Sequence, residues 1–469
     1  MNFTDQRFVA FFAVAFIFYY LPPLKKAQLF VVVAASLIFY ASDQPYLLLL
    51  LIAAASITST TSYFVIANKR RRTQLAWAWA GVAANLCFLG FFKYKGLLYD
   101  AIPGDQADSA INFIIGIPLP IGISFYTFHG ISLLVDVYRG GKNTILGNSD
   151  NLSFSNHFLK TVLYLTFFPQ LIAGPIVKAH VFYPQIRAKS FAEIDWERAI
   201  KNLIIGYFLK SVIADNLQEQ TYFLAYPYFT AYSTSTLLTL LFGYSMQIFS
   251  DFAGYSLIAL GLARLFGYDL PENFRFPYIS QSFSEFWTRW HISLSSWLRQ
   301  YLYFPLGGNR TGRLRTFANL MIVMFLGGLW HGAAWSYAVW GAWHGIALAV
   351  ERMFRGSWFY RSQAPIMQAV RMAVIFSFVT VAWLLFKLPN FDHVLAFLRA
   401  LFDNSQLPLN VAFGLGVAVY ALPVIGLHAL HFWERHLPKS RLDIVGYGGL
   451  VAAIVLNSGE SNAFIYFQF

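Results

Sequence analysis

Long uninterrupted runs of apolar residues dominate the pattern of this chain. The first three are "RFVAFFAVAFIFYYLPPL" (7–24), "LFVVVAASLIFYA" (29–41) and "YLLLLLIAAASITSTTSYFVIA" (46–67). Further runs lie near 75–92, 112–135, 158–178, 199–215, 235–268, 316–329, 334–351, 367–387, 410–432 and 443–457. Because a helix needs roughly 20 apolar residues to cross a bilayer, we expect about ten to thirteen membrane spans or re-entrant pieces.

The runs also decide the fold class. They show no alternation with a period of two, which excludes a membrane β-barrel. Backbone groups within lipid must be hydrogen-bonded inside the segment, so the spans are helices. The chain is 57% hydrophobic and 12% charged, which is half the charge of a soluble domain, about 25%. The sequence therefore predicts an all-α polytopic membrane protein.

We expect one membrane domain over residues 1–469, with three parts of different composition. Residues 1–110 read as simple hydrophobic hairpins and residues 356–469 as plain spans, whereas residues 111–355 are denser in Pro, Gly, Trp and charge. Polar residues inside membrane segments are costly and usually functional. The middle part is therefore where catalytic or binding residues are expected.

The net charge of +12 is distributed over short loops, such as "LKK" (24–26) and "KRRR" (69–72). Positively charged loops tend to stay in the cytoplasm, and two predicted spans separate these two clusters, which places the N-terminus outside. Asp100, Asp105 and Asp108 lie in a loop without basic residues, which fits an outside position. The charge thus indicates topology and lipid contact, and we expect no nucleic-acid partner.

A bound metal ion is not expected. Cys87 is the single cysteine of the chain, which excludes an intramolecular disulfide and a cysteine metal cluster. Free cysteines are mostly buried, so a packing role is predicted for it. The chain also lacks H-E-x-x-H, G-x-S-x-G and phosphate-loop motifs, which removes several common enzyme classes.

The densest group of polar and aromatic residues is "PENFRFPYISQSFSEFWTRWHISLSSWLRQYLYFPLGGNRTG", residues 271–312. On a continuous helix, His291 shares a face with Trp287 on one side and with Ser295 on the other. Glu285 and Arg289 have the same spacing of four, which predicts an ion pair. The segment is typical of an interfacial helix or of a helix that lines a water-filled cavity.

His331 follows two small residues, Gly327 and Gly328, that allow helices to approach closely, and it lies beside Trp330. Apolar surroundings favour the neutral imidazole, which is the form that a general base needs. Such a base takes the proton of a hydroxyl that attacks an acyl thioester. The alternative is a packing histidine that is hydrogen-bonded to a backbone carbonyl.

The tetrahedral intermediate of acyl transfer also needs hydrogen-bond donors for its oxyanion. His291, Arg289 and Asn273 are candidates, and the sequence leaves the choice among them open. Asp251, in "QIFSDFAGYS", either orients a histidine, lines a polar cavity or caps a helix. His344 lies thirteen residues after His331, which on one straight helix is about 220° around the axis, so packing is the favoured interpretation for it.

Several stretches together resemble a known family. They are "LPIGISFYTFHGISLLVDVYRG" (119–140), "FFPQLIAGPI" (167–176), "DFAGYS" (251–256), "NFRFPYISQSFSEFWTRWHISLSSWLRQYLYFPLGGNR" (273–310), "GGLWHGAAWSYAVWGAWHG" (327–345) and "FIYFQF" (464–469). This combination is similar to the membrane-bound O-acyltransferases (MBOAT), in particular to the bacterial alginate O-acetyltransferase membrane-subunit (AlgI-like) branch.

The resemblance implies a helical bundle around a central tunnel and an O-acyltransferase activity. The family's active-site histidine falls on His331, in "LWHG", and its second functional histidine falls on His291. The remaining candidates for contact with substrate or tunnel are the following: Asn273, Arg289, Trp287, Ser295, Trp330 and Asp251.

The resemblance further implies transfer of an acetyl or D-alanyl group from a cytoplasmic donor across the bacterial inner membrane to an extracytoplasmic polymer. The expected donor is acetyl-CoA or an acyl-carrier thioester, with no bound cofactor. The expected partners are a periplasmic acetyltransferase or relay protein and membrane lipid.

The chain departs from the alginate-type pattern at two positions. Gln300 follows the arginine of "WLRQYLY" and Leu257 follows "DFAGYS", where many alginate-type members have an acidic residue. Cellulose or another exopolysaccharide is therefore as good an acceptor as alginate. Two further alternatives remain: transfer of a longer acyl chain to a lipid or protein, and a transporter with histidines in a proton path.

Overall fold

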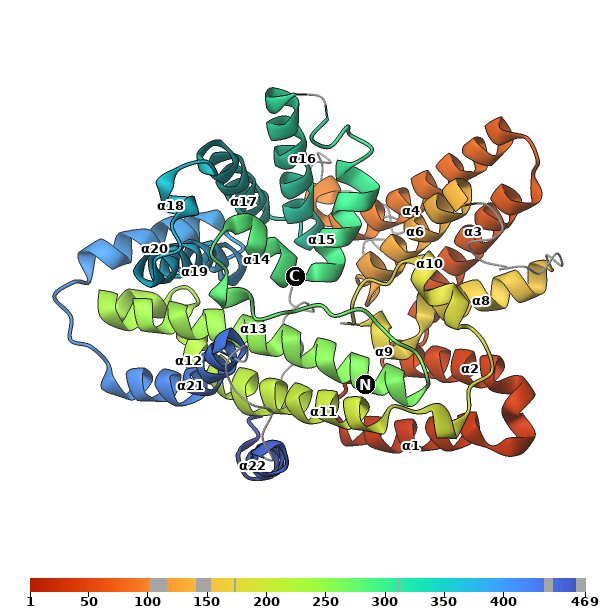
Figure 1. Ribbon diagram of the computed structural model, residues 1–469, viewed down its shortest axis with the longest axis horizontal. Coiled ribbons are helices and arrows are strands. Elements are labelled where there is room, and N and C mark those ends of the chain that lie inside the picture. Colours follow the sequence, from red (N-terminus) through yellow and green to blue (C-terminus); the bar gives the residue numbers. More distant parts are fainter. Residues whose placement is uncertain (101–115, 141–152, 173, 311, 434–441, 461–469) are drawn as a thin grey trace. The chain divides into compact units, whose positions relative to one another are not determined.

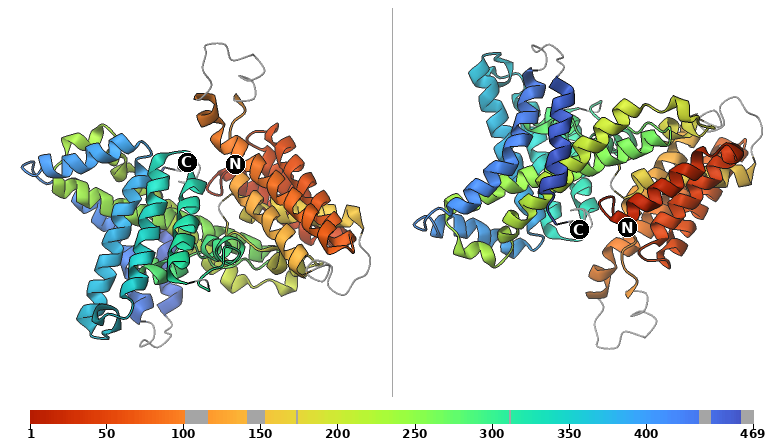
Figure 2. Two further views of the ribbon diagram at one scale, coloured as in Figure 1. Left: turned by 90° about the horizontal axis from the view of Figure 1, so that it is seen from above. Right: turned by 90° about the horizontal axis from the view of Figure 1, so that it is seen from below.

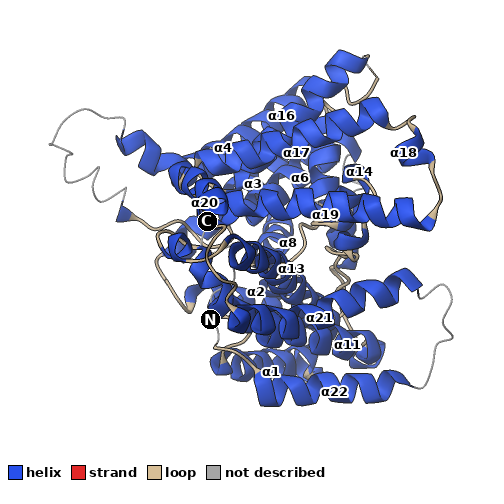
Figure 3. Cartoon of the chain, turned by 90° about the vertical axis from the view of Figure 1, so that its left-hand side faces the viewer, coloured by secondary structure: helices blue, strands red, loops and turns tan. Residues whose placement is uncertain are grey.

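The computed structural model describes residues 1–100, 116–140, 153–172, 174–310, 312–433 and 442–460. These residues form helices and connecting turns, and the described part contains no β-strand (Figure 3). The chain divides into two compact units: unit 1 comprises Met1–Leu203 and Ile258–Pro271, and unit 2 comprises Ile204–Leu257 and Glu272–Phe469. The all-α fold class is confirmed, and the division into three parts by composition stays a prediction.

Among the described residues, six helices are long and apolar enough to cross a membrane. They are Pro22–Ala41, Leu47–Ala67, Arg71–Gly96, Thr234–Leu265, Pro365–Lys387 and Val411–Phe432. Two shorter apolar helices, Gln6–Tyr20 and Val445–Asn457, accompany them. Large apolar side chains such as Leu49 and Leu422 are more than half exposed, which is costly in water but not in lipid. The protein is a multi-pass membrane protein, and the larger number of spans expected from the sequence stays a prediction.

Unit 1 is built around three neighbouring helices. Its helices are α1 (Gln6–Tyr20), α2 (Gln28–Ala41), α3 (Leu47–Ala67), α4 (Arg71–Asp100), α6 (Ile123–Gly140), α8 (Phe154–Thr166), α9 (Phe168–Leu171) and α10 (Ala179–Phe182). The helices α3, α4 and α6 pack against one another (Figure 1, Figure 2). A Cβ at Gly81 would lie 2.5 Å from Thr61 Oγ1, and one at Gly130 would lie 2.9 Å from Asn85 Oδ1. Small residues thus set the separation of these helices, as is common in membranes.

Side chains of α6 accept hydrogen bonds from backbone N–H groups at the start of α10 and in the extended stretch just before it. His129 Nε2, Ser132 Oγ and Asp136 Oδ2 accept hydrogen bonds from the backbone N–H groups of residues 177, 179 and 180, at 3.1, 3.0 and 3.3 Å. Their spacing of three and four places them on one face of the helix. Because buried backbone N–H groups need partners, α6 supplies them where the predicted run 158–178 ends in the extended residues 175–178.

Unit 2 contains the remaining helices, and α11 (Trp196–Tyr207) and α13 (Thr234–Leu265) contribute residues to both units. The others are α12 (Asp215–Thr221), α14 (Phe283–Arg289), α15 (Ile292–Leu298), α16 (Arg313–His331), α17 (Trp335–Phe354), α18 (Trp358–Arg361), α19 (Pro365–Lys387), α20 (Phe391–Asp403), α21 (Val411–Trp433) and α22 (Leu442–Asn457). Contacts between α16 and α17 depend on glycine: a Cβ at Gly328 would lie 2.2 Å from Tyr337 O, and one at Gly341 would lie 2.3 Å from Met324 O.

The structure tests the prediction for Cys87, whereas part of the acidic loop is not described. Cys87 is exposed on α4, so the prediction that it is buried is wrong. Its neighbour Leu86 is also exposed, so neither side chain packs in the interior. Asp105, Asp108 and the terminal stretch 464–469 lie outside the described residues.

Candidate active site

The helix that carries the first candidate histidine is interrupted at that residue. Ser282 caps α14, with its Oγ accepting from the backbone N–H of Glu285 at 3.0 Å, and α14 ends at Arg289. His291 then takes a left-handed conformation, with φ 42°, before α15 begins at Ile292. The prediction that His291 shares a helix face with its neighbours four residues away is therefore wrong. The backbone N–H of Ile292 instead donates to Asn273 O at 2.9 Å, which pulls the chain out of the helix.

Asn273 fixes the orientation of the His291 ring. Asn273 Oδ1 lies 3.0 Å from His291 Nδ1 and also accepts from Ser293 Oγ at 2.8 Å. The amide nitrogen of Asn273 donates to Ser256 Oγ at 3.1 Å. Because an amide oxygen only accepts, Nδ1 carries the proton of the neutral ring and Nε2 is the acceptor. His291 is 1% exposed, so this arrangement is held inside the protein.

His331 is the last residue of α16 and is surrounded by aromatic rings. Its ring centroid lies 4.9 Å from that of Trp330, 5.2 Å from Trp340 and 4.9 Å from Phe386. The chain turns at Gly332, where a Cβ would lie 2.3 Å from the ring of Tyr337. Glycine at this position therefore lets the ring of Tyr337 pack against the turn that follows His331.

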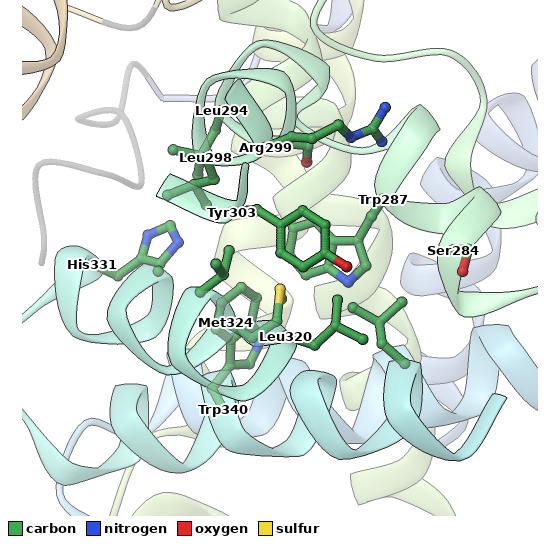
Figure 4. A pocket seen from close by; sticks show the side chains of 14 residues that line it. Ser284, Trp287, Leu294, Leu298, Arg299, Tyr303, Leu320, Met324, His331 and Trp340 are labelled. Atoms are coloured by element: carbon green, nitrogen blue, oxygen red, sulfur yellow. The ribbon is translucent and has the colours of Figure 1, made fainter. Parts of the chain in front are cut away.

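A cavity of about 190 Å³ opens beside His331 (Figure 4). Its lining comes from α14, α15, the π-helical turn Arg299–Tyr303, α16 and α17. The lining residues are Ser284, Trp287, Leu294, Ser295, Leu298, Arg299, Tyr303, Leu320, Val323, Met324, Gly327, His331, Trp340 and Leu348. Of the residues singled out in the sequence, Trp287, Ser295 and His331 meet at this cavity. It is mostly apolar, with a few polar groups, as ligand-binding cavities usually are.

The other candidates lie around the cavity or elsewhere in unit 2. Trp330 contacts both histidines, with centroid distances of 4.9 Å to His331 and 6.4 Å to His291. Arg289 forms the predicted ion pair with Glu285, at 2.9 Å, and does not line the cavity. It is thus less suited as an oxyanion donor than the sequence suggested.

Asp251 has a role that the sequence did not indicate. It is buried within α13, and its carboxylate lies 2.7 Å from Lys210 Nζ, which also binds Asp215 at 2.7 Å. It neither caps a helix nor contacts a histidine in these interactions. Buried charges need such partners, so the structure gives Asp251 a stabilising ion pair. No group of three or more His, Cys, Asp and Glu side chains suited to a metal ion is found in the part of the chain that the structure describes.

Several residues of the cavity were not identified from the sequence. Trp340, Arg299 and Tyr303 reach it only because α15, α16 and α17 fold together. The indole N–H groups of Trp287 and Trp340 are buried and have no acceptor among the described residues. Buried indole N–H groups usually find a partner. These two are therefore better placed than Arg289 to bind an oxygen of a substrate in the cavity.

Ser284 is fixed by a buried carboxylate on α17. Glu351 is 1% exposed and accepts from the backbone N–H of Ser284 at 3.0 Å and from its Oγ at 2.6 Å. Arg355, one turn further along α17, is 3.1 Å from the same carboxylate. This link joins the start of α14 to α17 and thereby positions one side of the cavity wall.

His344 lies behind that wall. The chain breaks between α16 and α17 at residues 332–334, so the single straight helix assumed for His331 and His344 is wrong. His344 is fully buried and contacts Trp340 at 4.8 Å and Trp287 at 5.1 Å between ring centroids. It does not line the cavity. His331 and His344 therefore both contact Trp340, but of these two only His331 lines the cavity where a substrate fits.

Comparison with known proteins assigns the family. Residues 123–391 match the model of the MBOAT, membrane-bound O-acyltransferase family. This segment contains His291, His331 and all the residues that line the cavity. The chain belongs to the membrane-bound O-acyltransferase family. Membership makes it an O-acyltransferase of the membrane, and the resemblance read from the sequence motifs is confirmed.

Curated relatives of the chain are named for different polymers. The chain is 34% identical over 435 residues to the probable alginate O-acetylase AlgI of Pseudomonas putida, with 85% of this chain and 86% of the relative covered. It is 35% identical to the peptidoglycan O-acetyltransferase of Helicobacter pylori over 69% of this chain and 64% of that relative. It is 29% identical to the teichoic acid D-alanyltransferase of Bacillus subtilis over 58% of this chain and 70% of that relative. For the probable alginate O-acetylase AlgI of Azotobacter vinelandii, the match covers 66% of the relative's length.

Proposed function

We propose that this protein moves an acetyl group from a cytoplasmic thioester donor across the bacterial inner membrane for O-acetylation of an exopolysaccharide. The observation that carries the proposal is the position of His331 at the 190 Å³ cavity inside the segment that matches the family. The relatives named as alginate O-acetylases support an acetyl group and a polysaccharide acceptor. The donor is acetyl-CoA or an acyl-carrier thioester, and a periplasmic acetyltransferase or relay protein completes the transfer.

In this mechanism His331 is the general base. Its ring removes the proton of the acceptor hydroxyl as the oxygen attacks the thioester carbonyl, and the thiolate leaves. His291, with Nε2 as its acceptor nitrogen, assists by accepting a hydrogen bond from an N–H or O–H group of the donor. Trp287 and Trp340 line the same cavity, and their buried indole N–H groups have no acceptor among the described residues. In this mechanism they donate to the oxyanion that develops on the carbonyl oxygen.

Replacement of His331 tests the catalytic role. Acetylation of the polymer is measured in cells that contain equal amounts of His331→Ala or wild-type protein in the membrane. A positioned general base contributes about 10²- to 10⁴-fold, so acetylation should fall by at least a hundredfold. His344→Phe is the matched control because His344 contacts the same Trp340 but does not line the cavity. Retained acetylation in His331→Ala, or equal loss in both variants, would overturn the assignment.

The indole donors are tested separately with Trp287→Phe and Trp340→Phe, which keep an aromatic ring and remove the N–H. Loss of one oxyanion donor lowers the turnover rate by about 10²- to 10³-fold. The rate should fall more than the affinity for the donor, since the interaction strengthens in the transition state. Acyl-donor profiling of the same preparations, with acetyl and D-alanyl thioesters, distinguishes the proposed acetyl transfer from the D-alanyl transfer for which two relatives are named.

A further inference from the structure

A second cavity, of about 390 Å³, lies in unit 2 and shares no lining residue with the cavity at His331. Its walls come from α13, α19 and α21, together with the turn that contains Tyr278. All three helices are long and apolar enough to cross the membrane. A volume of this size falls in the range of pockets for small organic ligands, about 300–1,000 Å³.

The lining of this cavity is apolar and carries no formal charge. Met246, Met372 and Phe376 are typical of its walls, and none of its lining residues is Asp, Glu, Lys or Arg. His431 and Arg289 act electrostatically on His428, but neither lines the cavity, and Arg289 is paired with Glu285 at 2.9 Å. A charged headgroup therefore has no counter-charge here, and desolvating it would be costly.

One polar side chain that lines this cavity has a ring nitrogen without a hydrogen-bond partner among the described residues. His428 is 5% exposed, and its Nδ1 lies 2.9 Å from Val424 O. Because a carbonyl oxygen only accepts, Nδ1 carries the proton and Nε2 is left as an acceptor. Nε2 is buried and has no hydrogen-bond partner among the described residues. Such groups are rare in folded proteins, because an unsatisfied buried acceptor costs free energy.

The surroundings hold His428 in place but do not satisfy it. Its ring stacks on Tyr278, with centroids 5.5 Å apart and an interplanar angle of 19°, and it meets the edge of Phe249 at 4.9 Å. The hydroxyl of Tyr278 donates to Ser245 O at 2.5 Å and is not available for His428. The free acceptor is therefore held in a fixed position at the cavity.

We propose that this cavity binds a neutral membrane lipid with a free hydroxyl, of the diacylglycerol class. The hydroxyl donates to His428 Nε2, and an acyl chain lies against Met246, Met372 and Phe376. A hydroxyl meets the need for a donor without a charge, whereas an ammonium or a phosphate headgroup would be buried without a counter-charge. This site is independent of acyl transfer, and its test does not use enzyme activity.

Photolabelling of the full-length protein in nanodiscs of phosphatidylcholine tests the proposal. One probe is a diacylglycerol with a diazirine in the acyl chain, and the other is the same molecule with its hydroxyl converted to a methyl ether. We expect labelled residues on the segments of α13, α19 and α21 that line the cavity. The ether should label about fivefold less, the factor that corresponds to one neutral hydrogen bond. Equal labelling by the two probes would overturn the role of His428.

Variants separate the hydroxyl contact from the apolar cavity. His428→Phe keeps the ring packing and removes the acceptor, so the diacylglycerol probe should label it as weakly as the ether labels the wild-type protein. Ala429→Trp fills the cavity and should abolish labelling. Leu430→Trp is its control, because Leu430 is 55% exposed and does not line the cavity. Thermal unfolding verifies that each variant is folded. Undiminished labelling of His428→Phe or of Ala429→Trp would contradict the proposal.

Discussion

The close contact between α16 and α17 predicts that a methyl group added at Gly341 will destabilise the protein, and the structure gives the magnitude of this effect. In Gly341→Ala, the added Cβ would lie 2.3 Å from Met324 O, whereas ordinary contact begins at 3.4 Å. The two helices must therefore separate by about 1 Å, the difference between these two distances. Overpacking of this kind costs about 1–3 kcal/mol, and the better helix propensity of alanine, about 0.5–1 kcal/mol, offsets only part of it.

The same displacement affects the active site, because His331 is on α16 and Trp340 is on α17. A misplacement of about 1 Å lowers catalytic rates by about a hundredfold. We expect Gly341→Ala to unfold at a lower temperature in detergent and to lose most acetyl transfer in membrane vesicles. Gly414→Ala is the control, since a Cβ at Gly414 meets nothing within 4 Å. Equal unfolding temperatures and activities for the two variants would refute the reasoning.

Two further predictions concern buried polar groups. Lys210→Met leaves two carboxylates buried without their cation, and we expect the free energy of unfolding to fall by about 3–5 kcal/mol. Lys201→Ala, which breaks the exposed pair with Glu197, should change it by less than about 1 kcal/mol; similar losses in denaturant titrations would contradict this. Asn273→Ala removes the acceptor that orients His291, and initial rates of acetyl transfer should fall about tenfold. Asn273→Asp keeps an acceptor and should recover most of the rate, whereas a purely structural role would leave both variants equally impaired.

The general architecture could be predicted because it depends on the length and composition of segments. A run of apolar residues is helical in a membrane whatever its neighbours are, because its backbone groups have no other partners. The runs 29–41, 46–67 and 367–387 accordingly correspond to α2, α3 and α19. Interruptions within runs were harder to predict. The extended residues 175–178, within the run 158–178, lie where α6 supplies hydrogen bonds to the backbone, and such bonds form only after folding.

The candidate active site, like the fold, could be predicted from the sequence only in part. The family motifs singled out His331 and His291, because sequence alone contains their characteristic neighbours. The helical spacing proposed for His291 failed because the backbone of Asn273, eighteen residues earlier, pairs with the chain at Ile292. No local pattern reports such a contact. The close approach of α16 and α17, which brings Trp340 to His331, likewise depends on two segments at once.

The sequence by itself thus determined the fold class, the family and the two histidines, since these follow from local composition and from motifs that persist along the chain. Only the tertiary structure decided which side chains meet at a cavity. It paired Asp251 with Lys210, placed Trp340 beside His331 and placed His428 in the wall of an apolar cavity. These outcomes depend on distances between residues far apart in the chain, and such distances are set by the packing of whole helices rather than by the residues next to each position.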